Sequence, residues 1–160
     1  MSEELSTIDI KILDEMQKDA SLSTGELAER VGLSQSPCWR RLQRLKAEGY
    51  ISRQVAILNP EKFEQRFVIF ANLRMETLSE ERRAEFQRKV EVTPEILECY
   101  TVFGEMDVVL KVIATSLPWY QSFIFKTILK LPGVKDIQST VTLTEIKCST
   151  AIPLRGTRAL

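Results

Sequence analysis

Basic side chains gather in one short segment of this sequence, and the chemistry open to them is contact with phosphates or base edges. Residues 30–54 hold six basic residues against one acidic residue, a net charge of +5, whereas residues 1–29 have a net charge of −6. The whole chain is neutral, with 22 basic and 22 acidic residues. Because guanidinium groups pair with phosphates and guanine edges, residues 30–54 are a candidate nucleic-acid contact. The alternative is an arginine-rich helix face that is merely solvated.

A second group of side chains suits a small ligand. The run Phe103-Gly104-Glu105-Met106-Asp107 separates two apolar stretches. A carboxylate in this run can pair with an ammonium group, and the N–H groups of a glycine-containing turn can bind a carboxylate. The run is therefore a candidate site for a small charged ligand. The alternative is that Gly104 only permits the turn and that Asp107 hydrogen-bonds within it.

Several kinds of enzyme chemistry are excluded. The sequence contains no histidine, which rules out histidine-based triads, histidine general bases and histidine-ligated metals. Its three cysteines, Cys38, Cys99 and Cys148, form no Cys-x-x-Cys pair that would bind zinc or act in redox catalysis. There is also no glycine-rich phosphate loop and no nucleophile beside a visible base. We therefore expect a protein that is not an enzyme and that carries no metal and no cofactor.

Composition and the start of the chain predict a soluble cytoplasmic protein. Hydrophobic residues make up 44% and charged residues 28%, which is the balance of a globular chain. The few cysteines, odd in number, favour a reducing compartment. The start Met1-Ser2-Glu3-Glu4-Leu5 lacks the parts of a secretory signal, and no apolar run approaches the ~20 residues of a membrane span. We expect no contact with a membrane.

Three helices are expected in the first 50 residues. The first begins after Ser6 or Thr7. Ser23 followed by Glu26 is a capping-box signature for the second, and Gly32 suits its left-handed end. The third begins after one of two serines, tolerates a proline in its first turn and runs to about residue 48. Its buried face comprises Cys38, Leu42 and Leu45, and its opposite face comprises Ser36, Arg40, Gln43 and Arg44.

These helices predict a DNA-binding domain. Two short helices joined by a tight turn, with a third packed across them, form a helix-turn-helix arrangement, and residues 50–58 have the pattern of a strand that would make it winged. We expect the start of the third helix to enter the major groove. Arg41 has the alternative of pairing with an acid of the first helix such as Asp9, Trp39 is expected to pack on the wing, and Cys38 to be a core thiol. The expected DNA contacts are Ser34, Gln35, Ser36, Pro37, Arg40, Arg41, Gln43 and Arg44.

The second half of the chain predicts a different domain. Strand patterns at 67–76, 96–103, 107–114 and 135–147 alternate with helix patterns after Ser79 and Ser116. This βαββαβ order is the ferredoxin-like arrangement, so the whole chain is α+β, with domains at residues 1–59 and 60–160. Val68 and Phe70, on the less apolar side of the first strand, predict a homodimer that covers the second sheet face.

Four stretches carry a family resemblance. They are Ile8-Asp9-Ile10-Lys11-Ile12-Leu13, residues 31–42 with Ser36-Pro37-Cys38, Gly49-Tyr50-Ile51, and Gly104-Glu105-Met106-Asp107. Together they resemble the leucine-responsive regulatory protein (Lrp)/AsnC family, the feast/famine transcription regulators. The resemblance covers nearly the whole chain, and each motif lies in its expected domain.

The resemblance implies a regulator that binds double-stranded operator DNA and a small-molecule effector, which is usually an amino acid. Such proteins assemble as homodimers and often as a tetramer of dimers, and the effector sits between sensor domains near the loop that joins the second and third sensor strands. In this chain the implied effector residues are Phe103, Gly104, Glu105, Met106, Asp107 and Thr140.

Two other functions are weighed against this one. The first is an architectural, nucleoid-type protein that binds DNA broadly with little dependence on an effector. The second is a metabolic regulatory subunit, because the ferredoxin-like fold hosts many unrelated functions.

Overall fold

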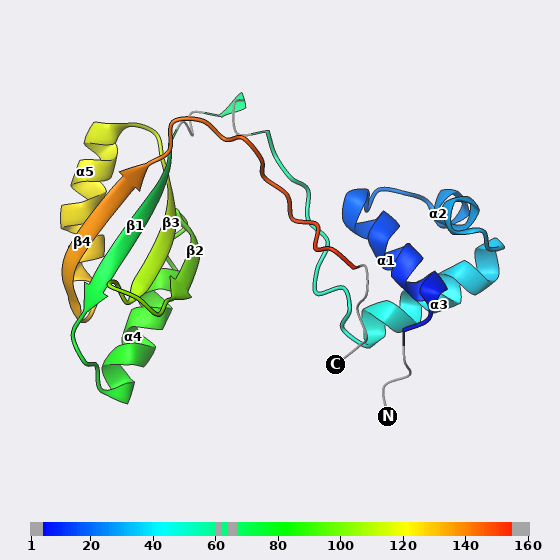
Figure 1. Ribbon diagram of the computed structural model, residues 1–160, viewed down its shortest axis with the longest axis horizontal. Helices are drawn as coiled ribbons and strands as arrows, with labels where there is room; N and C mark the ends of the chain where they lie inside the picture. Colours follow the sequence, from blue (N-terminus) through cyan, green and yellow to red (C-terminus); the bar gives the residue numbers. More distant parts are fainter. Residues whose placement is uncertain (1–4, 60–61, 64–66, 155–160) are drawn as a thin grey trace. The chain divides into compact units, whose positions relative to one another are not determined.

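A computed structural model describes residues 5–59, 62–63 and 67–154, which form two compact units (Figure 1). One unit runs Leu58–Ile146, and the rest of the described chain forms the other. Of the expected boundary at Asn59 and Pro60, Pro60 lies outside the described residues. The sequence placed residues from Lys147 onward in the second domain, but the described part of that segment groups with the first unit.

A side-chain clamp holds this final segment to the first helix, α1 (Thr7–Lys18). The amide of Gln17 donates to the Ile152 carbonyl at 2.9 Å and accepts from the Ile152 N–H at 3.0 Å. Both hydrogen bonds lie within the first unit. Nothing in the local sequence pattern predicts them, because the two residues are 135 positions apart.

Local capping signals set the bounds of α1, α2 (Thr24–Val31) and α3 (Gln35–Ala47). Ser6 forms a capping box with Asp9, and Ser23 forms the predicted one with Glu26. Gly32 ends α2 with a φ of 74°. Ser34 is the N-cap of α3 but makes no side-chain capping bond. Its side chain would usually bind the N–H of the third helical residue, which here is Pro37 and has none.

The three helices share one small core, and the predicted inner face of α3 is confirmed. Cys38 and Leu45 are fully buried in it, and burial raises the pKa of the Cys38 thiol, as expected for a core thiol. The buried members are Ile12, Met16, Leu27, Ala28, Val31, Cys38, Leu42 and Leu45.

The prediction of a strand over residues 50–58 is wrong. No described residue between α3 and position 67 lies in a strand, and Val55, Ile57 and Leu58 are exposed. A strand needs a ladder partner, and none of the described residues pairs with this segment. Trp39 therefore has no described strand to pack on, contrary to expectation.

The second unit is the predicted ferredoxin-like domain. Its four strands lie in the order β2-β3-β1-β4, with every neighbouring pair antiparallel. The helices α4 and α5 connect them on one face of the sheet, and a short 3-10 turn (Ile128–Lys130) follows α5 (Figure 1). The elements are β1 (Phe67–Met75), α4 (Glu80–Glu91), β2 (Ile96–Thr101), β3 (Val108–Ala114), α5 (Leu117–Lys126) and β4 (Val134–Val141).

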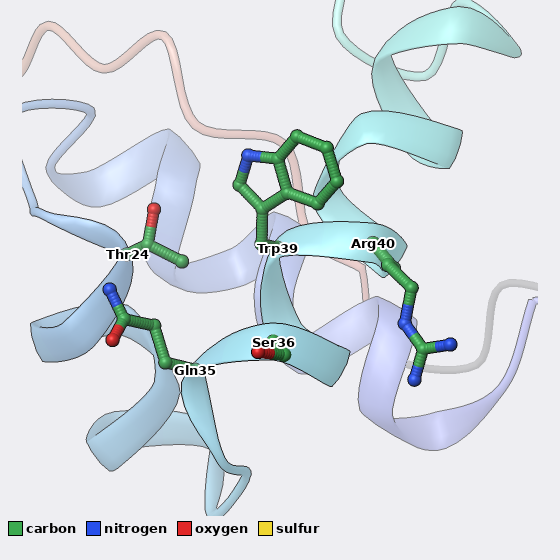
Figure 2. A pocket seen from close by; sticks show the side chains of 5 residues that line it. All are labelled: Thr24, Gln35, Ser36, Trp39 and Arg40. Atoms are coloured by element: carbon green, nitrogen blue, oxygen red, sulfur yellow. The ribbon is translucent and has the colours of Figure 1, made fainter.

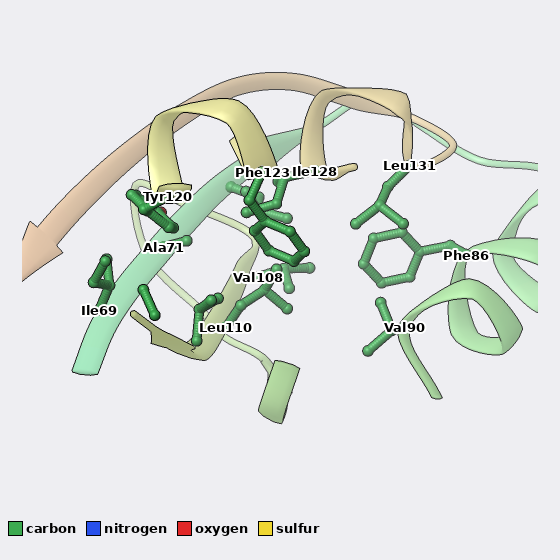
Figure 3. Close-up of a cluster of buried hydrophobic side chains, with 13 residues drawn as sticks. Ile69, Ala71, Phe86, Val90, Val108, Leu110, Tyr120, Phe123, Ile128 and Leu131 are labelled. Atoms are coloured by element: carbon green, nitrogen blue, oxygen red, sulfur yellow. The ribbon is translucent and has the colours of Figure 1, made fainter. Parts of the chain in front are cut away.

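Alternation along the central strands separates the two faces of this sheet. Ile69, Ala71 and Leu73 of β1 are fully buried beneath the helices, where Phe86 and Phe123 meet them in one core (Figure 3). The side chains between them on β1 and β3 point to the other face, which neither α4 nor α5 covers. We name this the outer face; its apolar residues are Val68, Phe70, Val109 and Ile113.

The last strand is shorter than predicted. β4 ends at Val141, although the alternating pattern continues to residue 147. Thr142 still donates its N–H to the Val68 carbonyl at 3.0 Å, close to where β1 begins. Beyond that point β1 offers no described ladder partner, and Leu143 is 99% exposed. No helix in the described part of the chain is long and apolar enough to span a membrane.

Gly133 is a position where the fold requires glycine. Its φ is +80°, and a Cβ there would lie 2.5 Å from Cδ2 of Leu78. Gly133→Ala should therefore lower the free energy of unfolding of the second unit by about 1–2 kcal/mol, from backbone strain and crowding. Gly49→Ala is the matched control, because Gly49 has the same φ but open space around it. Chemical denaturation that finds Gly133→Ala as stable as the unsubstituted protein would contradict the described packing.

Candidate functional site

The outward side of α3 is the strongest candidate site. The helix rests on the core through Cys38, Leu42 and Leu45, so its other side faces solvent. Arg40 is exposed and makes no ion pair with any residue that the structure describes. The exposed side chains of this face are Gln35, Ser36, Trp39, Arg40 and Gln43, and we name them the recognition face.

A buried carboxylate fixes the flank of α3 that faces α1. Asp9 is 1% exposed, and its two oxygens accept from Arg41 at 3.0 Å and from Arg44 at 2.7 Å. The same carboxylate also accepts from the Ser6 backbone N–H at 3.0 Å and from the Ser6 hydroxyl at 2.6 Å. One side chain thus closes the α1 cap and joins α1 to α3.

This arrangement lowers the pKa of the Asp9 carboxyl. Burial on its own raises that pKa, but the Ser6 hydroxyl, the Ser6 N–H, the Arg41 hydrogen bond and the Arg44 charge together outweigh burial. Asp9 is therefore a carboxylate at neutral pH, matched by two guanidinium groups.

Two predicted DNA contacts are thus engaged within the protein. The pairing of Arg41 with Asp9, one of its two expected roles, is confirmed. Arg44 was expected to point away from the core, but its guanidinium turns back to Asp9 and is only 28% exposed. Helical spacing places the Cα of Arg44 near the outer side, and the length of an arginine side chain allows it to reach the buried acid. The basic group left on the middle of the recognition face is Arg40.

A surface hollow of about 380 Å³ lies beside Arg40, between α3 and the start of α2 (Figure 2). Its lining residues are Thr24, Gln35, Ser36, Trp39 and Arg40, and we name it the α3 hollow. Figure 2 shows the Trp39 ring between Thr24 and Gln35 on one side and Arg40 on the other. Trp39 is 52% exposed.

The structure brings part of the expected DNA set together. Gln35, Ser36 and Arg40 meet at the α3 hollow, Ser34 and Pro37 lie beside them in the chain, and Gln43 is exposed one turn further on. Sequence reasoning missed Thr24 and Trp39. A signal was present for Trp39, because it lies one helical turn after Gln35.

The second candidate site is the loop between β2 and β3. The Val102 N–H donates to the Asp107 carbonyl at 2.9 Å and closes the loop. The side chain of Asp107 accepts from the Met75 N–H at 2.7 Å, and its own N–H donates to the Leu73 carbonyl at 2.9 Å. Asp107 therefore continues the pairing of β3 with β1 one residue before β3 begins, and one of its carboxylate oxygens already has a backbone partner.

Gly104 has no backbone reason to be glycine. Its φ is not positive, unlike those of Gly32, Gly49 and Gly133. A Cβ at Gly104 would meet nothing within 4 Å, and the neighbouring Phe103 is fully exposed. Neither turn geometry nor packing within the described chain therefore requires glycine at this position.

Within one chain, Thr140 does not lie beside this loop. It pairs with Phe70 on the outer face, whereas Asp107 contacts Leu73 and Met75 further along β1. Its expected place in the effector site therefore stays a prediction, and a site that includes both would need a second copy of the sensor unit.

Comparisons with known proteins find matches for both units. A family model described as Lrp/AsnC ligand binding domain matches residues 68–152, and one described as winged helix-turn-helix DNA-binding matches residues 5–52. The leucine-responsive regulatory protein of Escherichia coli K12 is 34% identical over 152 residues, which cover 95% of this chain and 93% of that protein.

Solved structures show the same likeness. A transcriptional regulator of Neisseria meningitidis, solved in complex with L-Met, has a TM-score of 0.91 at 36% identity and covers 94% of this chain and 97% of its own. An AsnC family transcriptional regulator from Agrobacterium tumefaciens has a TM-score of 0.89 at 35% identity. The match covers 93% of this chain and 97% of that regulator. The likeness spans both units, as the sequence motifs predicted. The chain therefore belongs to the Lrp/AsnC family of transcription regulators.

Proposed function

We propose that this protein binds specific operator DNA through α3 and adjusts that binding in response to an amino acid. The observation that carries the DNA part is the recognition face, where Arg40 is unpaired among the described residues while Asp9 holds the opposite flank of α3 in place. A helix anchored in this way presents its side chains to the major groove without first having to become ordered. We expect the protein in the cytoplasm, where its DNA lies, and we expect no enzyme activity.

A homodimer is part of the proposal. The outer face carries Val68, Phe70, Val109 and Ile113 on the neighbouring strands β1 and β3, and Val68 lies directly opposite Ile113. An apolar sheet face of this kind is typical of an interface between copies. A two-fold dimer carries two α3 helices, so its operator should be an inverted repeat with half-sites about one or two DNA turns apart. A tetramer of such dimers is the larger assembly that we expect.

Selection from a random duplex library tests the DNA part. The full-length protein should enrich one motif with two-fold symmetry. An enriched pool without a shared motif would contradict sequence-specific binding.

The loop of residues 103–106 is proposed to touch the effector. Gly104, open to solvent and not required by the fold, supports this role, and so does the exposed Phe103 beside it. The related regulator of Neisseria meningitidis was solved with L-Met. Methionine is therefore the first amino acid to test among the twenty.

Gly104→Val should abolish the effector response without harming the fold. A ligand that binds the folded state raises its apparent stability by RT ln(1 + [L]/Kd). We expect one or a few amino acids to raise the melting temperature of the unsubstituted protein, and Gly104→Val to melt at the same temperature without ligand but to lose that rise. Thermal melts with each amino acid measure both effects.

Gly25→Ala is the control for this experiment, because it adds a methyl group to α2 with only ordinary contacts. It should keep the full response. A Gly104→Val protein that still responds at the same ligand concentration would place the effector elsewhere.

A further inference from the structure

The two flanks of α3 differ in a way that the proposed function does not explain. The flank towards α1 is charged and internally paired, since Arg41 and Arg44 bind Asp9. The flank towards α2 carries Trp39, an aromatic side chain that is 52% exposed beside an open hollow. Leaving half of a tryptophan in water forgoes a large gain in burial, so this side chain suits an apolar partner that is absent from the free protein.

We propose that Trp39 and Thr24 read the methyl group of a thymine in operator DNA. This inference rests on the proposed function, because it takes α3 to enter the major groove. There, the C5-methyl of thymine is the apolar feature of the base edges, and the other edge groups are hydrogen-bond donors and acceptors. An apolar wall on a recognition helix therefore selects thymine over cytosine at the base pair that it meets.

The lining of the α3 hollow fits a base edge. Figure 2 shows the ring of Trp39 and the side chain of Thr24 on neighbouring sides of the hollow, with the amide of Gln35 next to them. The indole and the threonine methyl supply apolar surface. Gln35 supplies an amide, the group that pairs with the donor and acceptor of adenine. An apolar wall beside an amide is the chemistry needed to read an A·T step.

Charge argues for DNA as the occupant of the α3 hollow. Arg40 lines it as well, and it has no ion-pair partner among the described residues. None of the described residues that line the α3 hollow is acidic. A base edge flanked by phosphates complements this combination of one guanidinium, one amide and an aromatic ring. A protein partner of basic character would instead be repelled.

Uracil substitution tests the proposal, because replacing thymine with uracil removes only the C5-methyl group. The duplex that the full-length protein selects is prepared with uracil at each thymine position in turn. We expect one thymine per half-site to matter, with a loss in affinity of about fourfold on substitution, the effect of one buried methyl group. With Trp39→Ala, the same substitution should cost nothing at that position.

Two further variants keep the test informative. Thr24→Ser retains the hydroxyl and removes one methyl group, so it should weaken the preference for thymine over uracil at the same base pair. Trp39→Leu replaces Trp39→Ala if the alanine variant does not fold. The affinity of Trp39→Leu for the uracil duplex should approach its affinity for the thymine duplex. Circular dichroism and melting curves establish that each variant is folded.

The outcomes separate this inference from the proposed function. If no uracil position weakens binding, or if Trp39→Ala and Trp39→Leu keep the same thymine preference as the unsubstituted protein, the inference is overturned while operator binding stands. If the unsubstituted protein selects no sequence, the proposed function itself fails. A Trp39→Ala protein that binds all duplexes equally well but changes its assembly state would show that the α3 hollow holds another copy of the chain, which also overturns the inference.

Discussion

Asp9→Ala should lower the free energy of unfolding of the first unit by about 2–4 kcal/mol, the combined cost of a weakened helix cap and of lost hydrogen bonds between a buried carboxylate and two partly exposed guanidinium groups. The substitution removes the carboxylate that Arg41 and Arg44 bind and also removes the side-chain half of the α1 capping box. Because Asp9 connects α1 to α3, operator affinity should fall with stability, although Asp9 itself is buried and cannot reach DNA. Chemical denaturation followed by circular dichroism measures the loss.

The stabilisation that Asp9 provides should also depend on pH. The folded-state pKa of Asp9 is lowered, so its stabilisation is fully present above the ordinary aspartate pKa of about 3.9 and is lost as the pH falls through the lower folded value. The stability difference between the unsubstituted protein and Asp9→Ala should therefore be constant near neutral pH and shrink in acid. A difference that grew in acid would contradict the ion pair.

Glu15→Ala is the matched control for Asp9→Ala. Glu15 also pairs with two cations, Lys18 and Arg30, but both of these are about half exposed. Solvent-exposed ion pairs contribute little, so this variant should be nearly as stable as the unsubstituted protein. Equal losses for Glu15→Ala and Asp9→Ala would show that burial of Asp9 has no special effect.

Arg40→Ala should weaken operator binding roughly tenfold to a hundredfold, because one arginine contact to a guanine edge contributes about 1–3 kcal/mol. Its melting temperature should not change, since Arg40 is exposed and has no ion pair among the described residues. Fluorescence anisotropy with the selected duplex measures the affinity. The expected signature is a loss of binding by a protein of unchanged stability.

Two comparisons sharpen the Arg40 prediction. Arg83→Ala removes the same charge from α4 in the sensor unit and should leave the affinity within error. Arg44→Ala should instead lower stability, because Arg44 holds Asp9. If Arg40→Ala binds the selected duplex as tightly as the unsubstituted protein, Arg40 does not contact the operator.

The elements that short-range chemistry determines were predictable from sequence. Ser23 and Glu26 lie three residues apart, so the capping box that starts α2 follows from local geometry. The alternation of Ile69, Ala71 and Leu73 likewise defines a strand with one buried face. The strand after α3 and the end of β4 were mispredicted because strand formation depends on a partner elsewhere in the chain, which local alternation does not reveal.

Only part of the candidate DNA site was predicted correctly, because local periodicity also does not reveal contacts between distant residues. Helical periodicity placed Arg40 and Gln43 on the exposed side of α3 correctly. It could not show that Arg44 bends back to Asp9, because a long side chain reaches across a flank that periodicity treats as outward. Trp39 was assigned to packing on a wing strand that the described residues do not form.

The central claim is that this protein recognises one operator sequence through α3, and the most direct test is a ratio of affinities. The affinity of the full-length protein is measured for the selected duplex and for a scrambled duplex of equal composition, over a series of salt concentrations. We predict that the selected duplex binds at least about a thousandfold more tightly. Added salt should weaken both complexes, because the counterions that binding releases from the DNA gain less entropy when they enter a more concentrated salt solution. Equal affinity for the two duplexes at every salt concentration would contradict the claim and indicate an architectural DNA-binding protein.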